Sequence, residues 1–179
     1  MRMETLALLV GLAAVFFFLL SFQFPKRGAI ILCNVISRVL YILQYLLLLA
    51  IEGAAMDISA IPSSMLAARK HTPFVQRHRI AILIFVNGVV VGIGLLVWRD
   101  WLSVIPVVGV LFETNALWMT EEKRIRRYSL AALPFWLFYN LSCHAYGAAL
   151  GNVLAAGSII TAILRYDFKK TGSDTSESK

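Results

Sequence analysis

Residues 53–68 read GAAMDISAIPSSMLAA, and whether this stretch crosses a bilayer decides the fold of the whole chain. It is short and contains Asp57 and Pro62, so an interfacial or re-entrant segment is the alternative to a membrane span. The other apolar runs bounded by charge are residues 5–22, 28–51, 80–98, 101–119, 128–145 and 147–164. Roughly 20 mostly apolar helical residues cross a hydrocarbon core of ~30 Å. With residues 53–68 included, the sequence predicts seven transmembrane helices.

The positions of the basic residues favour a spanning third segment. Lys and Arg gather after the first, third, fifth and seventh runs, within residues 26–27, 69–79, 123–127 and 169–179. The connections after the even-numbered runs hold Glu52, the pair Arg99-Asp100 and an uncharged turn. Short cytoplasmic loops are enriched in Lys and Arg, which predicts an N-terminus outside and a C-terminus inside. If residues 53–68 did not span, the basic cluster after them would lie outside.

The composition excludes a single water-soluble core. Of the 179 residues, 59% are hydrophobic and 15% are charged, whereas soluble domains are about 45–50% apolar and about 25% charged. The net charge of +7 lies in loops, where it reports orientation, so the lipid bilayer and not nucleic acid is the expected partner.

Cys33 and Cys143 fall in apolar runs without metal-ligand spacing and are expected to be small core residues. No cofactor is expected, and homo-oligomerisation stays open.

The two ends of the chain share a pattern that predicts an internal repeat. The amide Gln44 lies 25 residues before Arg69, and the amide Asn140 lies 25 residues before Arg165 (69 − 44 = 25; 165 − 140 = 25). Corresponding spans of the two halves are four membrane crossings apart, and an even number of crossings gives both halves the same orientation. Small transporters built from parallel repeats have this arrangement. The alternative is that short apolar hairpins resemble each other by composition alone.

This reading predicts an all-α membrane protein of two three-helix bundles joined by a linker helix. The expected parts are a first bundle at 1–70, a basic cytoplasmic loop and linker helix at 71–100, a second bundle at 101–168, and a disordered cytoplasmic tail at 169–179.

Five polar residues lie near the middle of the predicted bilayer when depth is counted from the basic turns at ~1.5 Å per residue. They are Arg38, Asp57, Glu113, Asn140 and Asn152. A charge at this depth costs about 2.5–3.5 kcal/mol, so Arg38 is expected to face inward and to pair with Glu113 or Asp57. One Arg with two carboxylates leaves a negative site or a protonated carboxyl, which favours a cation or a proton-coupled solute. The alternative is a structural ion pair that locks the bundles together, with Asp57 in the outer headgroup zone.

Aromatic residues complete the predicted site. Trp136 and Tyr139 follow Pro134 in the sixth run and offer a stacking face to a solute, although membrane-helix aromatics are more often lipid-facing or core residues. Other aromatic residues at span ends are expected to anchor the headgroup zone: Trp98, Trp101, Trp118 and Tyr166.

The motifs of common enzyme classes do not occur in the sequence. It contains no HExxH, GxSxG or Walker motif, so a function other than catalysis is expected. The leading hypothesis is a carrier or facilitator of a small polar solute, which binds at Arg38, Asp57, Glu113, Trp136, Tyr139, Asn140 and Asn152. The alternative is a non-transporting structural or regulatory membrane protein whose polar layer holds the bundles together.

Six segments carry a resemblance to a known family: LLSFQFPKR (19–27), YILQYLLLLAIEGA (41–54), WLSVIPVVGVLFETNALWM (101–119), KRIRRYSL (123–130), PFWLFYNL (134–141) and ILRYD (163–167). Together they resemble the YgjV-like bacterial inner membrane proteins, which are grouped with the MtN3, SWEET and PQ-loop proteins and PnuC-type carriers. The resemblance implies a multi-pass protein of the inner membrane with two three-helix bundles. It also implies that Asn152 and Trp136 are counterparts of SWEET midplane residues, although the Pro-Gln signature is absent and Asp57 replaces an expected Asn.

Overall fold

The computed structural model describes residues 3–21 and 27–167, and every regular element in these ranges is a helix. The long helices are α1 (Met3–Ser21), α2 (Arg27–Leu47), α3 (Ile51–Ala68), α5 (Arg79–Leu96), α6 (Val104–Trp118), α7 (Glu122–Ser142) and α8 (Tyr146–Ala162). The short elements are α4 (Pro73–Arg77), the 3-10 turn η1 (Trp101–Ser103) and the π-helical turn η2 (Ile163–Asp167). Each predicted run therefore contains one long helix. The predicted tail at 169–179 and Lys26 lie outside the described residues.

Helix composition separates two groups of long helices. Within the described residues, four stretches combine the length and hydropathy of a membrane span: Met3–Leu20, Arg79–Leu96, Trp101–Trp118 and Tyr146–Asp167. The other long helices, α2, α3 and α7, are more polar in composition, and they carry Arg38, Asp57 and Asn140. The fold is thus that of an all-helical membrane protein with several apolar helices, and its polar side chains are concentrated on particular helices.

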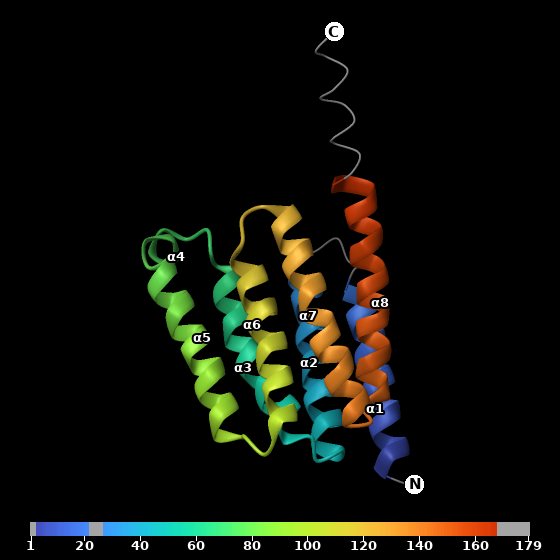
Figure 1. The fold of residues 1–179 in the computed structure, drawn as a ribbon. Helices are drawn as coiled ribbons and strands as arrows, with labels where there is room; N and C mark the ends of the chain where they lie inside the picture. Colours follow the sequence, from blue (N-terminus) through green and yellow to red (C-terminus); the bar gives the residue numbers. More distant parts are fainter. Residues whose placement is uncertain (1–2, 22–26, 168–179) are drawn as a thin grey trace.

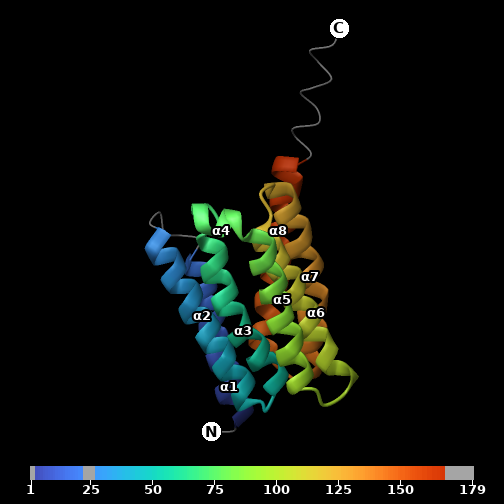
Figure 2. The same cartoon turned by 90° about the vertical axis from the view of Figure 1, so that its left-hand side faces the viewer.

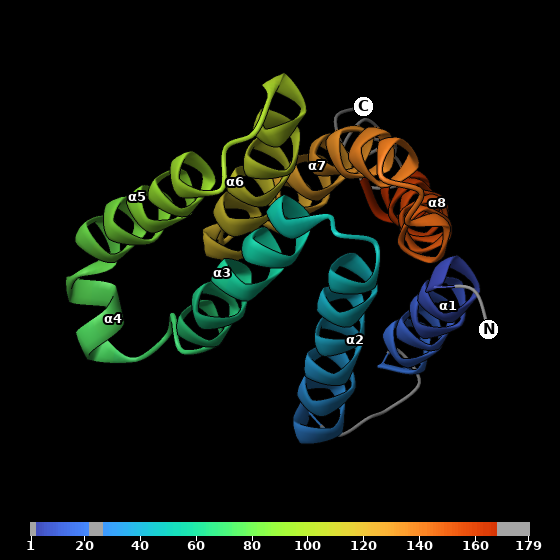
Figure 3. The same ribbon diagram turned by 90° about the horizontal axis from the view of Figure 1, so that it is seen from below.

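Six long helices form a closed ring when viewed along their axes (Figure 3). Neighbours around the ring are α1, α2, α3, α6, α7 and α8, and α8 packs against α1 to close it. Helix α5 lies outside the ring, where it contacts α3 and α6. Figures 1 and 2 show the long helices running side by side, with α4 at the end of the molecule opposite the N-terminus. Helices α1–α3 and α6–α8 therefore form two arcs that meet at α3–α6 and α8–α1.

The contact that closes the ring is made by two glycines. A Cβ atom added to Gly147 in α8 would lie 2.6 Å from the Gly11 Cα in α1, closer than real Cβ atoms approach other atoms. A Cβ atom on Gly11 would in turn lie 2.4 Å from the Gln44 amide in α2. Small residues let membrane helices approach closely without a hydrophobic driving force. Gly11 is thus the point at which α1, α2 and α8 meet.

The turns after α2 and after α7 have the same geometry. Leu49 and His144 both adopt positive φ, at 57° and 61°. The Ala50 N–H donates to the Tyr45 carbonyl at 2.9 Å, and the Ala145 N–H donates to the Asn140 carbonyl at 2.8 Å. Equivalent residues are therefore 95 positions apart (144 − 49 = 95).

The register predicted from the sequence was one residue off. Pairing Gln44 with Asn140 matched two amides, but the turn geometry aligns Asn140 with Tyr45. The predicted partner of Arg69, Arg165, lies in the π-helical turn η2, and such a turn accommodates one extra residue. Chemical similarity of Gln and Asn was thus a weaker guide to equivalence than backbone hydrogen bonding.

Trp118 is not the headgroup anchor that its place in the sequence predicted. Its side chain is buried against Ala67 and Val75 beneath α4, whereas Trp98, Trp101 and Tyr166 are exposed. Two cations bind the C-terminal carbonyls of α6 at this point: the Lys70 ammonium donates to Leu117 and Met119, and Arg79 donates to Trp118. Cations at a helix C-terminus satisfy free carbonyls and favour the helix dipole.

Candidate functional site

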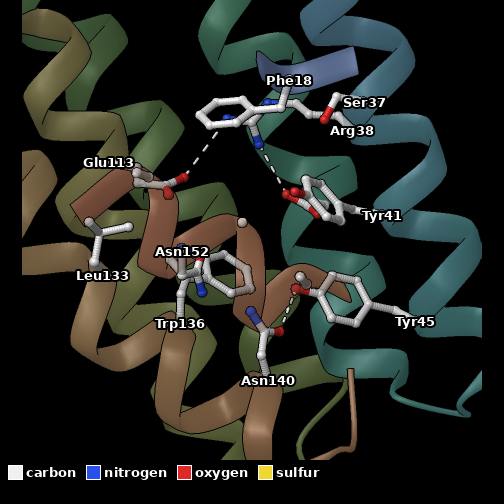
Figure 4. Close-up of a pocket in the computed structure, with 14 residues that line it drawn as sticks. Phe18, Ser37, Arg38, Tyr41, Tyr45, Glu113, Leu133, Trp136, Asn140 and Asn152 are labelled. Atoms are coloured by element: carbon white, nitrogen blue, oxygen red, sulfur yellow. Dashed lines mark hydrogen bonds and ion pairs between the residues drawn. The ribbon is translucent and has the colours of Figure 1, made fainter. Parts of the chain in front are cut away.

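The ring encloses a cavity of about 140 Å³ that both arcs line (Figure 4). Its lining residues are Phe18, Ser37, Arg38, Tyr41, Tyr45, Asp57, Glu113, Leu133, Trp136, Asn140, Ala148, Gly151, Asn152 and Ala155. They come from α1, α2 and α3 in one arc and from α6, α7 and α8 in the other. The cavity therefore lies at the interface between the two halves.

One end of the cavity is charged. Arg38 Nη1 lies 3.0 Å from Asp57 Oδ1, and Nη2 lies 3.8 Å from Glu113 Oε2. The Asp57 contact is a hydrogen-bonded ion pair within the first arc, whereas the Glu113 contact crosses to the second arc beyond hydrogen-bond distance. The sequence predicted that Arg38 pairs with either Glu113 or Asp57, and the structure places the Arg38 guanidinium between the two carboxylates.

The other end of the cavity is neutral and aromatic. The Tyr45 hydroxyl donates a hydrogen bond of 2.7 Å to Asn140 Oδ1, which joins α2 to α7. The Tyr45 and Trp136 rings are stacked, with centroids 6.4 Å apart and an interplanar angle of 21°. Figure 4 shows this hydrogen bond at the end of the cavity opposite Arg38 and Glu113. A solute in the cavity would thus contact charges at one end and aromatic faces at the other.

Ten of the fourteen lining residues form five pairs of equivalent positions in the two arcs. In α2 the cavity is lined by Arg38, Tyr41 and Tyr45, and in α7 it is lined by Leu133, Trp136 and Asn140. Each residue of α2 lies 95 positions before its counterpart in α7, so the two sets have the same helical spacing. Asp57 in α3 is likewise equivalent to Asn152 in α8, and Phe18 in α1 to Glu113 in α6. Residues three, four and seven apart share one face of a helix, so a repeated backbone repeats the lining positions. Their chemistry differs, which makes the two sides of the cavity unequal.

Two nitrogen donors of the lining are buried without a normal hydrogen bond in the structure. Asn152 Nδ2 has no partner. The Trp136 indole N–H faces the Glu113 carboxylate but does not reach hydrogen-bond geometry. Buried donors are usually satisfied, and exceptions often mark a site completed by water or a ligand.

Six of the seven predicted binding residues line the cavity, and Tyr139 does not. The Tyr139 hydroxyl accepts a hydrogen bond of 2.8 Å from the Gly53 N–H and lies 3.5 Å from Glu52 Oε2. Tyr139 is rotated about 100° around α7 from Asn140, which turns its side chain toward the end of α3. It therefore belongs to the contacts that seal the cavity and not to its wall.

Sequence reasoning missed part of the lining, mainly Phe18, Ser37, Tyr41, Tyr45 and Leu133. Tyr41 and Tyr45 could have been found from Arg38, because spacings of three and seven place them on the same helix face. The cavity does not resemble a metal centre: within the described ranges, no group of three or more His, Cys, Asp and Glu side chains could hold an ion.

A comparison with protein families identifies the family of this chain. A family model described as Imp-YgjV, bacterial inner membrane protein, matches residues 5–170. The chain belongs to the Imp-YgjV family. The YgjV-like resemblance of the sequence is confirmed, and the Imp-YgjV description together with the apolar helices identifies a multi-pass protein of the bacterial inner membrane. No curated protein and no solved structure matches the chain significantly.

Proposed function

We propose that this Imp-YgjV protein is a carrier or facilitator of a small polar solute that binds between the two arcs of its helical ring. The observation that carries the proposal is the cavity, because Arg38, Asp57 and Glu113 converge on it inside a ring with an apolar outer face. Ionisable residues within a membrane protein are costly and commonly mark solute or ion pathways. A binding site between two repeats is also the usual arrangement in small transporters.

In this proposal all seven long helices cross the membrane, with the N-terminus outside. The lower hydropathy of α2 and α3 fits this arrangement, since Arg38 and Asp57 face the cavity instead of lipid. That of α7 reflects the charged residues 123–127 at its start, which lie outside the cavity. The basic clusters at residues 69–79 and 123–127 then lie together on the cytoplasmic side. The proposed arrangement is SWEET-like, with two three-helix units and α5 as the linker helix.

The structure supports a state that is sealed on the outer side. Three contacts lie beneath the cavity near the outer turns: Tyr45 with Asn140, Tyr139 with Gly53, and Arg99 with Glu52 at 3.6 Å. At the opposite end, the Arg38 and Glu113 side chains remain 27% and 30% exposed. We infer an inward-facing carrier, in which rocking of the two arcs would break the outer contacts and open the cavity to the outside.

A non-transporting structural protein is the second candidate, and the Arg38–Asp57 ion pair is the observation that favours it. In that case the polar cluster would only hold the helices together. Loss of the ion pair would then lower the stability and abundance of the protein without changing any solute flux.

Uptake into proteoliposomes separates these two functions. Purified protein would be reconstituted and screened with radiolabelled sugars, vitamins, amino acids and organic cations, with flux normalised to inserted protein. We expect saturable uptake of one class that is lost in Arg38→Ala and Glu113→Gln. Glu121→Gln is the matched control, because Glu121 is exposed and pairs with Arg124 outside the cavity. Unchanged uptake in the cavity variants would show that this site assignment is wrong.

A further inference from the structure

We propose that the cavity selects a small organic monocation that carries a hydrogen-bond acceptor at a distance from its charge. This inference rests on the proposed function, because it names the class of solute that the carrier binds. Four properties of the cavity lead to it: its formal charge, its aromatic walls, an unsatisfied donor and its size.

The formal charge of the cavity favours a cationic solute over an anionic one. Its charged lining residues are one cation, Arg38, and two carboxylates, Asp57 and Glu113. The Arg38 hydrogen bond goes to Asp57 at 3.0 Å, while Glu113 at 3.8 Å is not hydrogen-bonded to it. With both carboxylates ionised, one negative charge is left over at Glu113, whose side chain is 30% exposed at this end of the cavity. A monocation beside Glu113 neutralises the cavity, whereas an anion would meet a guanidinium that is already engaged.

The walls of the cavity suit an organic cation better than a metal ion. Tyr41, Tyr45 and Trp136 line the wall below the charged residues. Aromatic faces attract organic cations through the ring quadrupole and shield their apolar parts from water. Metal ions of the alkaline-earth type instead prefer several oxygen ligands, which this wall does not offer.

The acceptor is inferred from Asn152. Its Nδ2 atom is buried and has no partner, and Asn152 lines the same cavity as the equivalent residue to Asp57. A buried amide donor left unsatisfied is unfavourable, and a carbonyl or ether oxygen of the solute would satisfy it. Asp57 and Asn152 occupy matching positions on opposite arcs, but Asp57 is engaged by Arg38, so Glu113 meets the cationic end of the solute and Asn152 meets its acceptor.

The cavity volume limits the solute to a small molecule. At about 140 Å³ the cavity is comparable with an engineered protein cavity of about 150 Å³ that binds benzene. Solutes the size of a disaccharide or a nucleotide do not fit this state of the cavity.

Matched probes test charge and acceptor separately. Acetylcholine is a monocation with an ester acceptor, 3,3-dimethylbutyl acetate is its neutral isostere, and pentyltrimethylammonium keeps the charge without the acceptor. Methylguanidinium and methylurea form a smaller pair in which only the neutral member carries an acceptor, so a preference for methylguanidinium would report the charge alone. Binding would be measured by the thermal midpoint of detergent-purified protein, since a ligand of the folded state raises that midpoint.

We expect at least one cation to bind about tenfold more tightly than its neutral isostere, as charge-assisted contacts allow. Glu113→Gln should abolish this preference, and Asn152→Leu should remove the advantage of acetylcholine over pentyltrimethylammonium. Glu121→Gln should change neither. If neither cation is preferred over its isostere, or if Glu113→Gln keeps the preference, the inference is overturned.

The two proposals fail in different ways. A cation that binds through Glu113 but is not taken up by proteoliposomes leaves the inferred solute class intact and contradicts the carrier function. Saturable uptake of a neutral or anionic solute that depends on Arg38 supports the carrier and contradicts the solute class.

Discussion

The Tyr45 hydroxyl donates a hydrogen bond of 2.7 Å to Asn140 Oδ1, and these two residues occupy the same position in the two halves of the ring. Equivalent residues of a two-fold arrangement can touch only near the axis that relates the halves. The Tyr45–Asn140 bond therefore lies close to that axis, and both arcs line the cavity above it. In the proposed carrier, this bond near the axis would have to break when the arcs rock apart on the outer side.

Removing this bond should weaken the closed state. Tyr45→Phe deletes the donor and leaves a buried amide oxygen without its partner, which costs about 1–3 kcal/mol. We expect a lower midpoint in thermal denaturation of the detergent-purified protein. Tyr146→Phe serves as the control, because Tyr146 is exposed at the start of α8 and its hydroxyl should matter little. Equal midpoints for wild type and Tyr45→Phe would contradict a closing role for the bond.

The two carboxylates should differ in their contribution to stability. Asp57→Asn removes a hydrogen-bonded, buried ion pair and should lower the free energy of unfolding by about 2 kcal/mol. Glu113→Gln removes a longer contact with a partly exposed side chain and should cost less than about 1 kcal/mol. Chemical denaturation of the two variants in the same detergent measures the difference. The reverse order would mean that Glu113, and not Asp57, is the main partner of Arg38.

Closure of the ring should depend on Gly147. Its Cβ in Gly147→Ala would meet the Gly11 backbone at 2.6 Å, so α1 and α8 must separate, at a cost of about 1–3 kcal/mol. Gly157→Ala is a control in the same helix, because a Cβ there meets nothing within 4 Å. We expect a lower thermal midpoint for Gly147→Ala and an unchanged or slightly raised one for Gly157→Ala. Tolerance of alanine at Gly147 would argue against the α1–α8 contact.

Labelling of single cysteines should report the orientation of the chain. In a background without Cys33 and Cys143, Leu49→Cys should react in intact spheroplasts with a membrane-impermeant maleimide. Arg124→Cys should react only after the membrane is opened. Both positions are exposed in the structure, so accessibility depends on the side of the membrane. The opposite pattern would invert the proposed topology, and labelling of both in intact spheroplasts would change the number of spans between them.

The sequence predicted the helices well because each is an apolar run bounded by charge or by a turn. It also located the polar cluster, since Arg38, Asp57 and Glu113 stand out in apolar surroundings. Tyr41 and Tyr45 did not stand out, because aromatic residues are common on every face of a membrane helix. Their inward direction follows only from their spacing to Arg38, because residues three and seven positions apart share one face of α2.

Two features depend on geometry that composition does not encode: the register of the repeat and the burial of Trp118. The repeat was assigned by matching Gln44 to Asn140, but the positive φ angles of Leu49 and His144 set the true register. Trp118 was expected at the headgroups because it follows an apolar run, yet α4 folds over it and buries it. The first error came from backbone geometry within a turn, and the second came from an earlier segment of the chain that folds over α6.

The Arg38–Asp57 ion pair also bears on how the protein is made. The two residues are 19 positions apart on consecutive helices, so the hairpin of α2 and α3 contains both charges of the pair. A growing chain emerges N-terminus first, and this hairpin leaves the ribosome before α6 has been synthesised. In the proposed seven-span arrangement, its charges can neutralise each other during insertion without help from the rest of the protein. Glu113 arrives later on α6, one of the helices apolar enough to insert with a single carboxylate. The order of synthesis thus assembles the charged end of the cavity in two steps, first a neutral pair and then the remaining carboxylate.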